Sequence, residues 1–286
     1  MLSYQHAYHA GGPADVHKHV ALHALTSYLV EKAKPLCAID VFAGEGLYSL
    51  TGPAAIKAGT FRRGIGALWN HRKKAPAAIT AYLSYVQALN ENGPLVRYPG
   101  SPALLSSVLR NQDQLIVNEL HPAAATALRR WARADHRVAV HRRDGLEALV
   151  ALVPPQLRRG IVVIDPSYEN AADYADTGTA TARAATKWAA GIFAVWYPLL
   201  ADQRHMPLLA ALDHGLSLPT LVSELTFDLP GLADAPERGL RGSGMVIINP
   251  PWRFDETMKA SGDWLAATLD LGAGAAHAMR WIHPPK

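Results

Sequence analysis

The sequence has a single cysteine, Cys37, which excludes a disulfide framework or a cysteine-based metal site within one chain. It lies in the apolar stretch from Pro35 to Val41, where we expect it to be a small buried hydrophobic side chain. No run of about 18 apolar residues occurs, as a membrane-spanning helix would need. The first residues also lack the charged and apolar regions of a signal peptide. We therefore expect a soluble, cytoplasmic protein with no membrane partner and no obligate protein partner.

A large charge excess is also missing. The chain carries 28 Lys and Arg against 24 Asp and Glu, a formal net charge of +4. This excess permits an anionic partner but does not require one. With 286 residues and 49% hydrophobic content, the chain can bury a large core, so we expect one domain over residues 1–286.

Short apolar segments alternate with helical patterns along most of the chain, as in a doubly wound α/β fold. We expect helices at 15–33, 101–110, 122–134, near 146, at 179–190 and at 255–269, with Asp15 as the N-cap of the first. We expect a Rossmann-like sheet of seven strands. The chain offers eight segments for them, at 36–41, 114–119, 137–141, 160–165, 192–197, 218–226, 245–249 and near 277–283. A mostly helical segment at about 52–100 interrupts this alternation as a small insertion subdomain. Residues 1–14 form an N-terminal arm.

The most informative stretch is IVVIDPSY, Ile161 to Tyr168. Its Ile and Val run predicts a strand that is buried on both faces of a parallel sheet, and Asp165 follows at the carboxyl end, where such sheets bind ligands. The Asp165 carboxylate and the Pro166 carbonyl are two hydrogen-bond acceptors, and Tyr168 supplies an aromatic ring.

These three residues suit methylation of an exocyclic amine on a nucleobase. The lone pair of such a nitrogen is delocalised into the ring, so the amine is a poor nucleophile. Two acceptors that each take an N–H draw the nitrogen towards tetrahedral geometry and aim its lone pair at a methyl donor. Tyr168 would stack on the extruded base. The alternative is that Asp-Pro only ends a strand with a turn, and the four residues DPSY alone do not separate the two interpretations.

Acidic residues at the other strand ends indicate the cofactor. Asp40 opens the turn DVFAGEG, but a nicotinamide dinucleotide fingerprint would need a third glycine where Ser49 stands. Glu119 follows the second strand, where a carboxylate can bind both ribose hydroxyls, and Asp144 follows the third, where it can bind an adenine amino group. A glycine turn, a ribose-binding acid and an adenine-binding acid at the ends of successive strands favour an S-adenosylmethionine site.

The histidines His6, His9, His17 and His19, with Asp15, raise the alternative of a metal site. The arm has no cysteine and only one carboxylate, and its histidines span an irregular segment. Contact with RNA, or an ordinary polar arm, fits these residues better, so we expect no metal.

The chain resembles the bacterial large-subunit (23S) ribosomal RNA adenine-N6 methyltransferase family nearly from end to end. The resemblance rests on LSYQHAYHAGGPADVHKH, DVFAGEG, RYPGSP, NELHP, RRDG, IDPSY, AVWYP and SGMVIINPPW, which follow one another in the family's order. It implies a class I S-adenosylmethionine-dependent methyltransferase fold, a helical insertion and an arm over the active site. It also implies N6-methylation of one adenine in ribosomal RNA.

The resemblance further implies roles for individual residues. The catalytic residues would be Asp165, Pro166 and Tyr168. The cofactor would be held by His19, Phe42, Gly44, Gly46, Ser101, Glu119, Asp144, Gly145 and Asp165, and the RNA substrate would be contacted by Tyr4, His6 and Lys18.

Two departures from the family pattern lie close to the chemistry. Ser167 replaces a second proline, which loosens the turn that aims the Pro166 carbonyl and predicts retained but slower catalysis. Phe42 replaces a histidine in the cofactor turn, which predicts weaker cofactor affinity. A second amino-methyltransferase motif, Asn249 to Trp252, follows a late strand, and we interpret it as structural or as part of a wall near the RNA.

Two other functions stay open at this stage. One is an RNA-binding or assembly protein that has lost catalysis, motivated by Ser167 and Phe42. The other is the same chemistry acting on DNA, because the base-holding residues bind adenine and not the sugar. We also hypothesise that phosphates are contacted by the basic side chains of the helical segment, which are Arg62, Arg63, Arg72, Lys73 and Lys74.

Overall fold

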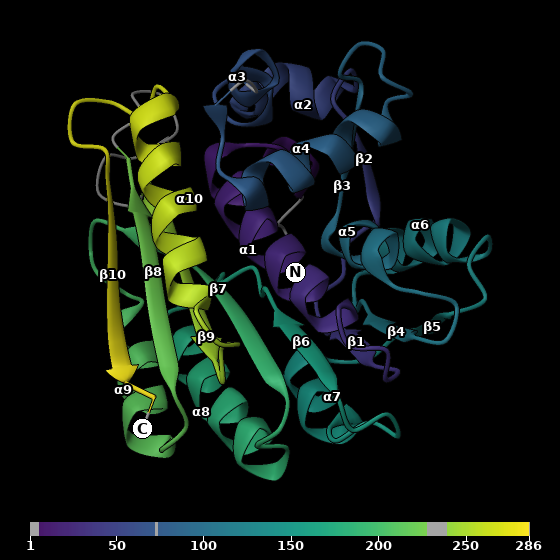
Figure 1. Ribbon diagram of the computed structural model, residues 1–286, viewed down its shortest axis with the longest axis vertical. Helices are drawn as coiled ribbons and strands as arrows, with labels where there is room; N and C mark the ends of the chain where they lie inside the picture. Colours follow the sequence, from purple (N-terminus) through teal and green to yellow (C-terminus); the bar gives the residue numbers. More distant parts are fainter. Residues whose placement is uncertain (1–5, 72–73, 228–238, 286) are drawn as a thin grey trace.

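The apolar segments come together in one sheet in the computed structural model, which describes residues 6–71, 74–227 and 239–285. Its strand order is β10-β8-β9-β7-β6-β1-β4-β5 (Figure 1). The strands are β1 Cys37–Asp40, β4 Gln114–Asn118, β5 Val138–His141, β6 Gly160–Ile164, β7 Ile192–Leu200, β8 Thr220–Thr226, β9 Leu240–Ile248 and β10 Ala276–His283. The prediction of seven strands is wrong, because the last predicted segment, β10, pairs with β8 and adds an eighth strand at the edge.

Five neighbouring strands, from β5 through β4, β1 and β6 to β7, run parallel. Strand β9 is antiparallel to both β7 and β8, and β10 is antiparallel to β8. In β6, Ile161 and Val163 join one hydrophobic core while Val162 and Ile164 join the other, as the alternation of side chains along a strand requires. The continuous apolar run therefore reflects burial on both faces, as predicted.

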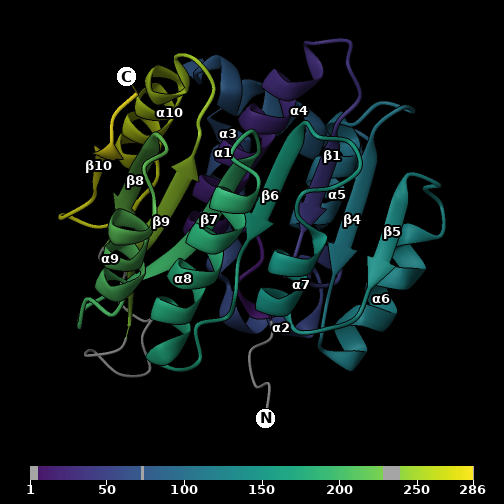
Figure 2. The same cartoon turned by 90° about the horizontal axis from the view of Figure 1, so that it is seen from below.

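Helices cover both faces of the sheet (Figures 1 and 2). The helices are α1 Pro13–Val30, α5 Ser101–Val108, α6 Pro122–Ala132, α7 Gly145–Leu152, α8 Ala172–Lys187, α9 Met206–Gly215 and α10 Phe254–Thr268. Helices α1, α5 and α10 pack on one face, and α7, α8 and α9 pack on the other. Helix α9 was not predicted from the sequence.

The segment between β2 (Leu47–Ser49) and β3 (Arg97–Pro99) is mostly helical. It contains α2 Pro53–Ala58, the short 3-10 helix η2 Thr60–Arg62, α3 Ile65–Asn70 and α4 Ala77–Leu89. Strands β2 and β3 pair with each other in a small separate sheet that was not predicted. Helix α4 packs on α1, and the hydroxyls of Tyr82 and Tyr98 are hydrogen-bonded at 2.8 Å beneath it. The segment thus lies over the amino-terminal helix.

The start of α1 differs from the prediction. Gly12 is the N-cap and Pro13 occupies the first turn, where its missing N–H costs nothing. Asp15 is therefore not the N-cap but lies inside the first turn, so its carboxylate is available to the site. The preceding 3-10 helix η1, His6–Tyr8, is held against the helical segment by hydrogen bonds from Thr60 Oγ1 to the carbonyl of Tyr8 and from the Ile65 N–H to that of Gly11.

Within the ranges given above, none of the helices is both long enough and apolar enough to cross a membrane.

Candidate active site

The acidic residues predicted from the strand ends meet at one edge of the sheet. Strand β1 lies between β4 and β6 and runs parallel to both, so their carboxyl ends are neighbours. A cavity of about 410 Å³ lies at this edge, within the size range of small-molecule sites. Among its lining residues are most of the predicted set: His6, Lys18, Phe42, Gly44, Ser101, Glu119, Asp144, Gly145, Asp165 and Pro166.

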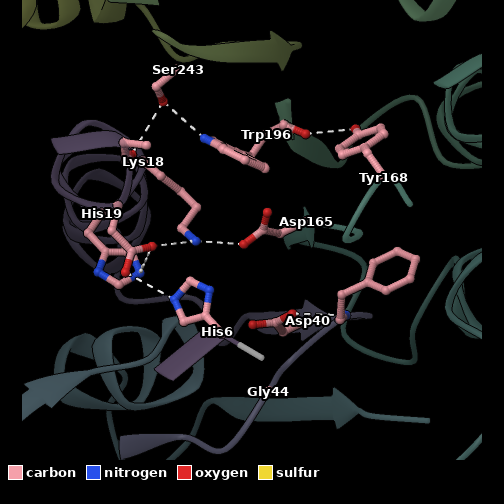
Figure 3. A network of polar contacts seen from close by, with 12 residues as sticks. His6, Lys18, His19, Asp40, Gly44, Asp165, Tyr168, Trp196 and Ser243 are labelled. Atoms are coloured by element: carbon pink, nitrogen blue, oxygen red, sulfur yellow. Dashed lines mark hydrogen bonds and ion pairs between the residues drawn. The ribbon is translucent and has the colours of Figure 1, made fainter. Parts of the chain in front are cut away.

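A buried ion network forms one wall of the cavity (Figure 3). The Lys18 Nζ atom lies 2.6 Å from Asp165 Oδ2 and 2.7 Å from Asp15 Oδ1. The side chain of Lys18 is only 4% exposed and that of Asp165 is 13% exposed. Lys18 is therefore not a surface cation. Its first contact is with the predicted catalytic carboxylate, and its predicted contact with RNA remains a prediction.

The network stabilises its charges by mutual contact. Burial acts to lower the pKa of the Lys18 ammonium, but Asp15 and Asp165 outweigh it and hold that pKa well above its usual range. Burial likewise acts to raise the pKa of the Asp15 carboxyl, but His6, Lys18 and His19 hold it well below its ordinary value. The wall thus carries a fixed cation between two carboxylates.

Asp40 is a second buried acid at this edge. Burial raises the pKa of its carboxyl to about 7, against the opposing effect of hydrogen bonds from Ser101 and from the Phe42 N–H. Its Oδ1 atom accepts the Phe42 N–H at 3.2 Å, and its Oδ2 atom has no hydrogen-bond partner among the described residues. Asp40 therefore fixes the start of the glycine turn.

Glu119 is oriented by two backbone donors. Its Oε2 atom accepts the Gly44 N–H at 2.8 Å, and its Oε1 atom accepts the His121 N–H at 2.7 Å. The glycine turn and the predicted ribose acid are thereby joined directly. Each carboxylate oxygen keeps lone-pair capacity for a further donor, such as a ribose hydroxyl.

The adenine side of the predicted cofactor site is tightly packed. Asp144 caps α7, and its Oδ1 atom accepts the N–H groups of Leu146 and Glu147 at 2.9 and 3.0 Å. A Cβ atom built on Gly145 would lie 2.2 Å from Cε1 of Phe42, so only glycine fits beside this ring. Gly44, with φ of +64°, has the left-handed conformation that favours glycine.

The comparisons with known proteins show the family of the chain. The family model described as "Ribosomal RNA large subunit methyltransferase D, RlmJ" matches residues 33–283. The chain belongs to this family. It is 38% identical to ribosomal RNA large subunit methyltransferase J of Escherichia coli (strain K12) and 35% identical to the protein of that name in Haemophilus influenzae. Each match covers 99% of this chain and 100% of the relative.

A solved structure shows the same fold. The crystal structure of a Legionella pneumophila protein matches with a TM-score of 0.85 and 32% identity, over 95% of this chain and 98% of that one. Membership of the RlmJ family makes the chain a methyltransferase that uses S-adenosylmethionine. The cavity fits this group, because it combines a glycine turn, an oriented carboxylate on Glu119 and an aromatic ring from Phe42.

Three residues implied by the resemblance, Gly46, His19 and Tyr168, lie outside the cavity lining of this RlmJ family member. His19 is fully buried, stacked on Tyr98 with ring centroids 5.3 Å apart, and neither ring nitrogen has a hydrogen-bond partner among the described residues. Tyr168 is 8% exposed and stacks on Tyr174 at 4.4 Å, while its hydroxyl donates to the Trp196 carbonyl at 2.7 Å. One face of the Tyr168 ring is therefore covered, and base stacking would need the other face.

The remaining predicted RNA contacts differ in position. His6 lines the cavity, with its Nε2 atom 3.0 Å from Asp15 Oδ2 and its ring 5.0 Å from that of Tyr48. Of the basic side chains, Arg62, Arg63 and Lys74 are exposed. Tyr4, Arg72 and Lys73 lie outside the described residues.

The second motif, Asn249 to Trp252, lies at the opposite edge of the sheet. Strand β9 runs antiparallel to β7, with Ile248 opposite Phe193, so Asn249 emerges where β7 begins. Its Nδ2 atom donates to the carbonyls of Ala189 and Gly191 at 3.3 Å. Asp165 instead follows β6, level with the residues after Val195. The motif does not border the cavity, and its interpretation as structural or as part of a wall near the RNA stays a prediction.

Sequence reasoning missed two residues of the site. Asp15 was assigned to a helix cap, although its spacing of three residues from Lys18 already places both on one face of α1. Trp196 was noticed only as part of a motif. Its Nε1 atom donates to Ser243 Oγ at 2.9 Å, and Lys18 Nζ lies 5.7 Å from its ring centroid.

In the part of the chain that the structure describes, no cluster of three or more His, Cys, Asp or Glu side chains is arranged to hold a metal ion.

Proposed function

We propose that this chain methylates the N6 amine of a specific adenine in large-subunit (23S) ribosomal RNA. The observation that carries the proposal is the position of Asp165 and Pro166 on the wall of a cavity whose other residues suit S-adenosylmethionine. The names of the two curated relatives support ribosomal RNA as the substrate. S-adenosylmethionine supplies an electrophilic methyl group on a sulfonium centre when it is bound.

The cavity residues fall into two groups: one would bind the cofactor, and the other would hold the target amine. Glu119, whose orientation is fixed by the Gly44 and His121 N–H groups, would accept the ribose hydroxyls. Asp144, which uses one oxygen to cap α7, would accept the adenine amino group. Ser101 and Phe42 complete this side of the cavity. The cationic cofactor is favoured by these carboxylates, so its binding is promoted by charge as well as by shape.

The Asp165 carboxylate and the Pro166 carbonyl would each accept one N–H of the target amine. Holding both hydrogens localises the nitrogen lone pair and aims it at the methyl group, so positioning supplies most of the acceleration. The amine becomes acidic only after methylation, so Asp165 need not be a strong base. Tyr168 would contribute the face of its ring that Tyr174 does not cover.

We assign RNA contact to the arm and to the helical segment. The arm would act over the active site through Tyr4 and His6, and residues 52–100 would form an insertion subdomain of the single domain 1–286. The exposed Arg62 and Arg63, and Lys74 farther along, would contact phosphates. Since the proposed substrate is ribosomal RNA, we place the reaction in the cytoplasm.

The test is a methylation assay with isotopically labelled S-adenosylmethionine and unmodified 23S ribosomal RNA, followed by digestion to nucleosides and mass spectrometry. DNA of the same sequence is assayed beside it. N6-methyladenosine in the RNA alone is the expected result. Label in the DNA alone would identify a DNA enzyme, and cofactor binding or RNA binding without any product would favour a binding protein.

A further inference from the structure

Asp15 is a buried carboxylate whose two oxygens serve different parts of the site. Its Oδ2 atom accepts the Gly11 N–H at 3.0 Å and lies 3.0 Å from His6 Nε2, so it holds the arm. Its Oδ1 atom lies 2.7 Å from Lys18 Nζ, and the Asp15 side chain is 3% exposed. The arm and the buried cation are thus joined through one residue.

The Lys18 ammonium is shared almost equally between two carboxylates. Its distances to Asp15 and Asp165 differ by 0.1 Å, from 2.7 and 2.6 Å. Asp15 and Lys18 are fixed relative to each other by their spacing on α1, whereas Asp165 comes from the end of β6. Asp15 therefore gives the ammonium a partner on its own helix, and the ammonium joins α1 to the residue that follows β6.

Sharing also divides the positive charge. A carboxylate that is fully neutralised by its own cation is a weaker hydrogen-bond acceptor for a neutral amine. One cation between two carboxylates leaves Asp165 only partly neutralised, close to where the target amine must donate.

We propose that Asp15 is a positioning residue for methyl transfer: by sharing the Lys18 ammonium, it orients Asp165 and keeps that carboxylate a strong acceptor for the target amine. The inference rests on the proposed function, since the amine is the substrate of that reaction. Asp15 itself acts through Lys18 and does not contact the reacting atoms.

The substitution Asp15→Asn separates this role from the holding of the arm. An asparagine can keep its oxygen towards Gly11 and His6, where Oδ2 now lies, and place its NH2 group where Oδ1 lies. The arm contact is then retained, but the ion pair with Lys18 is lost. Asp255→Asn is a matched control, since Asp255 is also in the first turn of its helix and does not line the cavity.

The readouts are the single-turnover rate of methyl transfer to 23S ribosomal RNA at saturating cofactor, the dissociation constant for S-adenosylmethionine and the melting temperature. We expect Asp15→Asn to slow transfer by about 10²-fold, as a small misplacement of a reacting group does. Cofactor affinity should not change, and Asp255→Asn should match the parent chain. A merely structural role would instead lower cofactor affinity and melting temperature together with the rate.

A double-mutant cycle with Lys18→Met completes the test. Because Asp15 acts through Lys18, the double variant should transfer methyl as fast as Lys18→Met alone. This comparison holds even if Asp15→Asn does not fold, because the double variant removes both charges of the pair. An Asp15→Asn rate equal to the parent rate, or an additional loss in the double variant, would overturn the role of Asp15. If the parent chain itself made no N6-methyladenosine, both the proposed function and the role of Asp15 would be wrong.

Discussion

The Nζ atom of Lys18 lies 2.6 Å from the Oδ2 atom of Asp165, although the two residues are 147 positions apart in the sequence. Lys18 belongs to α1, which packs on one face of the sheet, and Asp165 ends β6 at the carboxyl edge. The packing of the first helix on the sheet therefore completes the site that the strand ends begin. The arm before α1 is joined to the same network through Asp15 and His6.

Glu119 should be sensitive to the loss of a single oxygen. In Glu119→Gln, the amide NH2 must face either the Gly44 or the His121 N–H, and each of these now donates to a carboxylate oxygen. The NH2 group also cannot accept a ribose hydroxyl, so that hydroxyl loses an acceptor in the complex. This costs about 1–3 kcal/mol, and affinity for S-adenosylmethionine should fall by about 10- to 100-fold. Calorimetric titration measures this directly, with the exposed Asp270→Asn as control. Equal affinities of variant and parent would remove Glu119 from the cofactor site.

Gly145→Ala should also weaken cofactor binding, but through packing. The new Cβ atom would lie 2.2 Å from the Phe42 ring, so the ring must move out of its place on the cavity wall. Overpacking of this kind costs about 1–3 kcal/mol. Gly274→Ala is the control, since a Cβ atom there meets nothing within 4 Å. The prediction fails if the two alanine variants bind S-adenosylmethionine equally well.

Substitutions in the second motif should spare catalysis. Trp252 is 83% exposed, and Asn249 uses its side chain to bind carbonyls that precede β7 at the edge away from the cavity. Trp252→Ala and Asn249→Ala should therefore keep the parent rate of methyl transfer, although Asn249→Ala should lower the melting temperature because its φ of +56° is strained for alanine. If Asn249→Ala folded but lost turnover, the chemistry would lie at the edge of the sheet that carries Asn249, and the assignment of Asp165 would be wrong.

The stability of the fold should fall in mild acid. Burial, with a smaller contribution from His277, lowers the pKa of His17 to about 3. The unfolded chain binds this proton near pH 6.5, so between about pH 6.5 and 3 only the unfolded state is protonated and stability declines as the pH falls. At pH 5 this one group costs about 2 kcal/mol, by the linkage of pKa to free energy.

Urea unfolding at pH 7 and pH 5 tests this. His17→Gln should show a smaller loss of unfolding free energy between the two pH values than the parent chain does. Val20→Ala, a change of a buried apolar residue on the same helix, should lower stability at both pH values and keep the parent's pH dependence. Identical pH dependence of His17→Gln and the parent would show that His17 does not titrate as described.

Much of the site could be predicted because local patterns determine it. The Ile and Val run before Asp165 identifies a buried parallel strand, and parallel strands bring Asp165, Glu119 and Asp144 to one edge. The sequence set the motif at Asn249 aside because it follows a late strand. Only the structure shows that this strand runs antiparallel to β7.

What could not be predicted depends on packing between distant segments. No local periodicity shows that Lys18 reaches Asp165, that Asp15 faces the cavity wall instead of capping its helix, or that Tyr174 covers one face of Tyr168. The eighth strand was visible as a pattern, but its pairing with β8 is a long-range contact. Resemblance supplied residue roles, and only the structure places them relative to one another.

The most direct test of the central claim, that Asp165 is the acceptor for the target amine, is the single-turnover rate of methyl transfer for Asp165→Asn. The RNA is unmodified 23S ribosomal RNA at saturating S-adenosylmethionine, and Asp176→Asn, an exposed carboxylate on α8, is the control. We predict a loss of at least about 10²-fold for Asp165→Asn and none for the control, because the variant presents a donor where an acceptor is required. Transfer by Asp165→Asn at the parent rate would contradict the account.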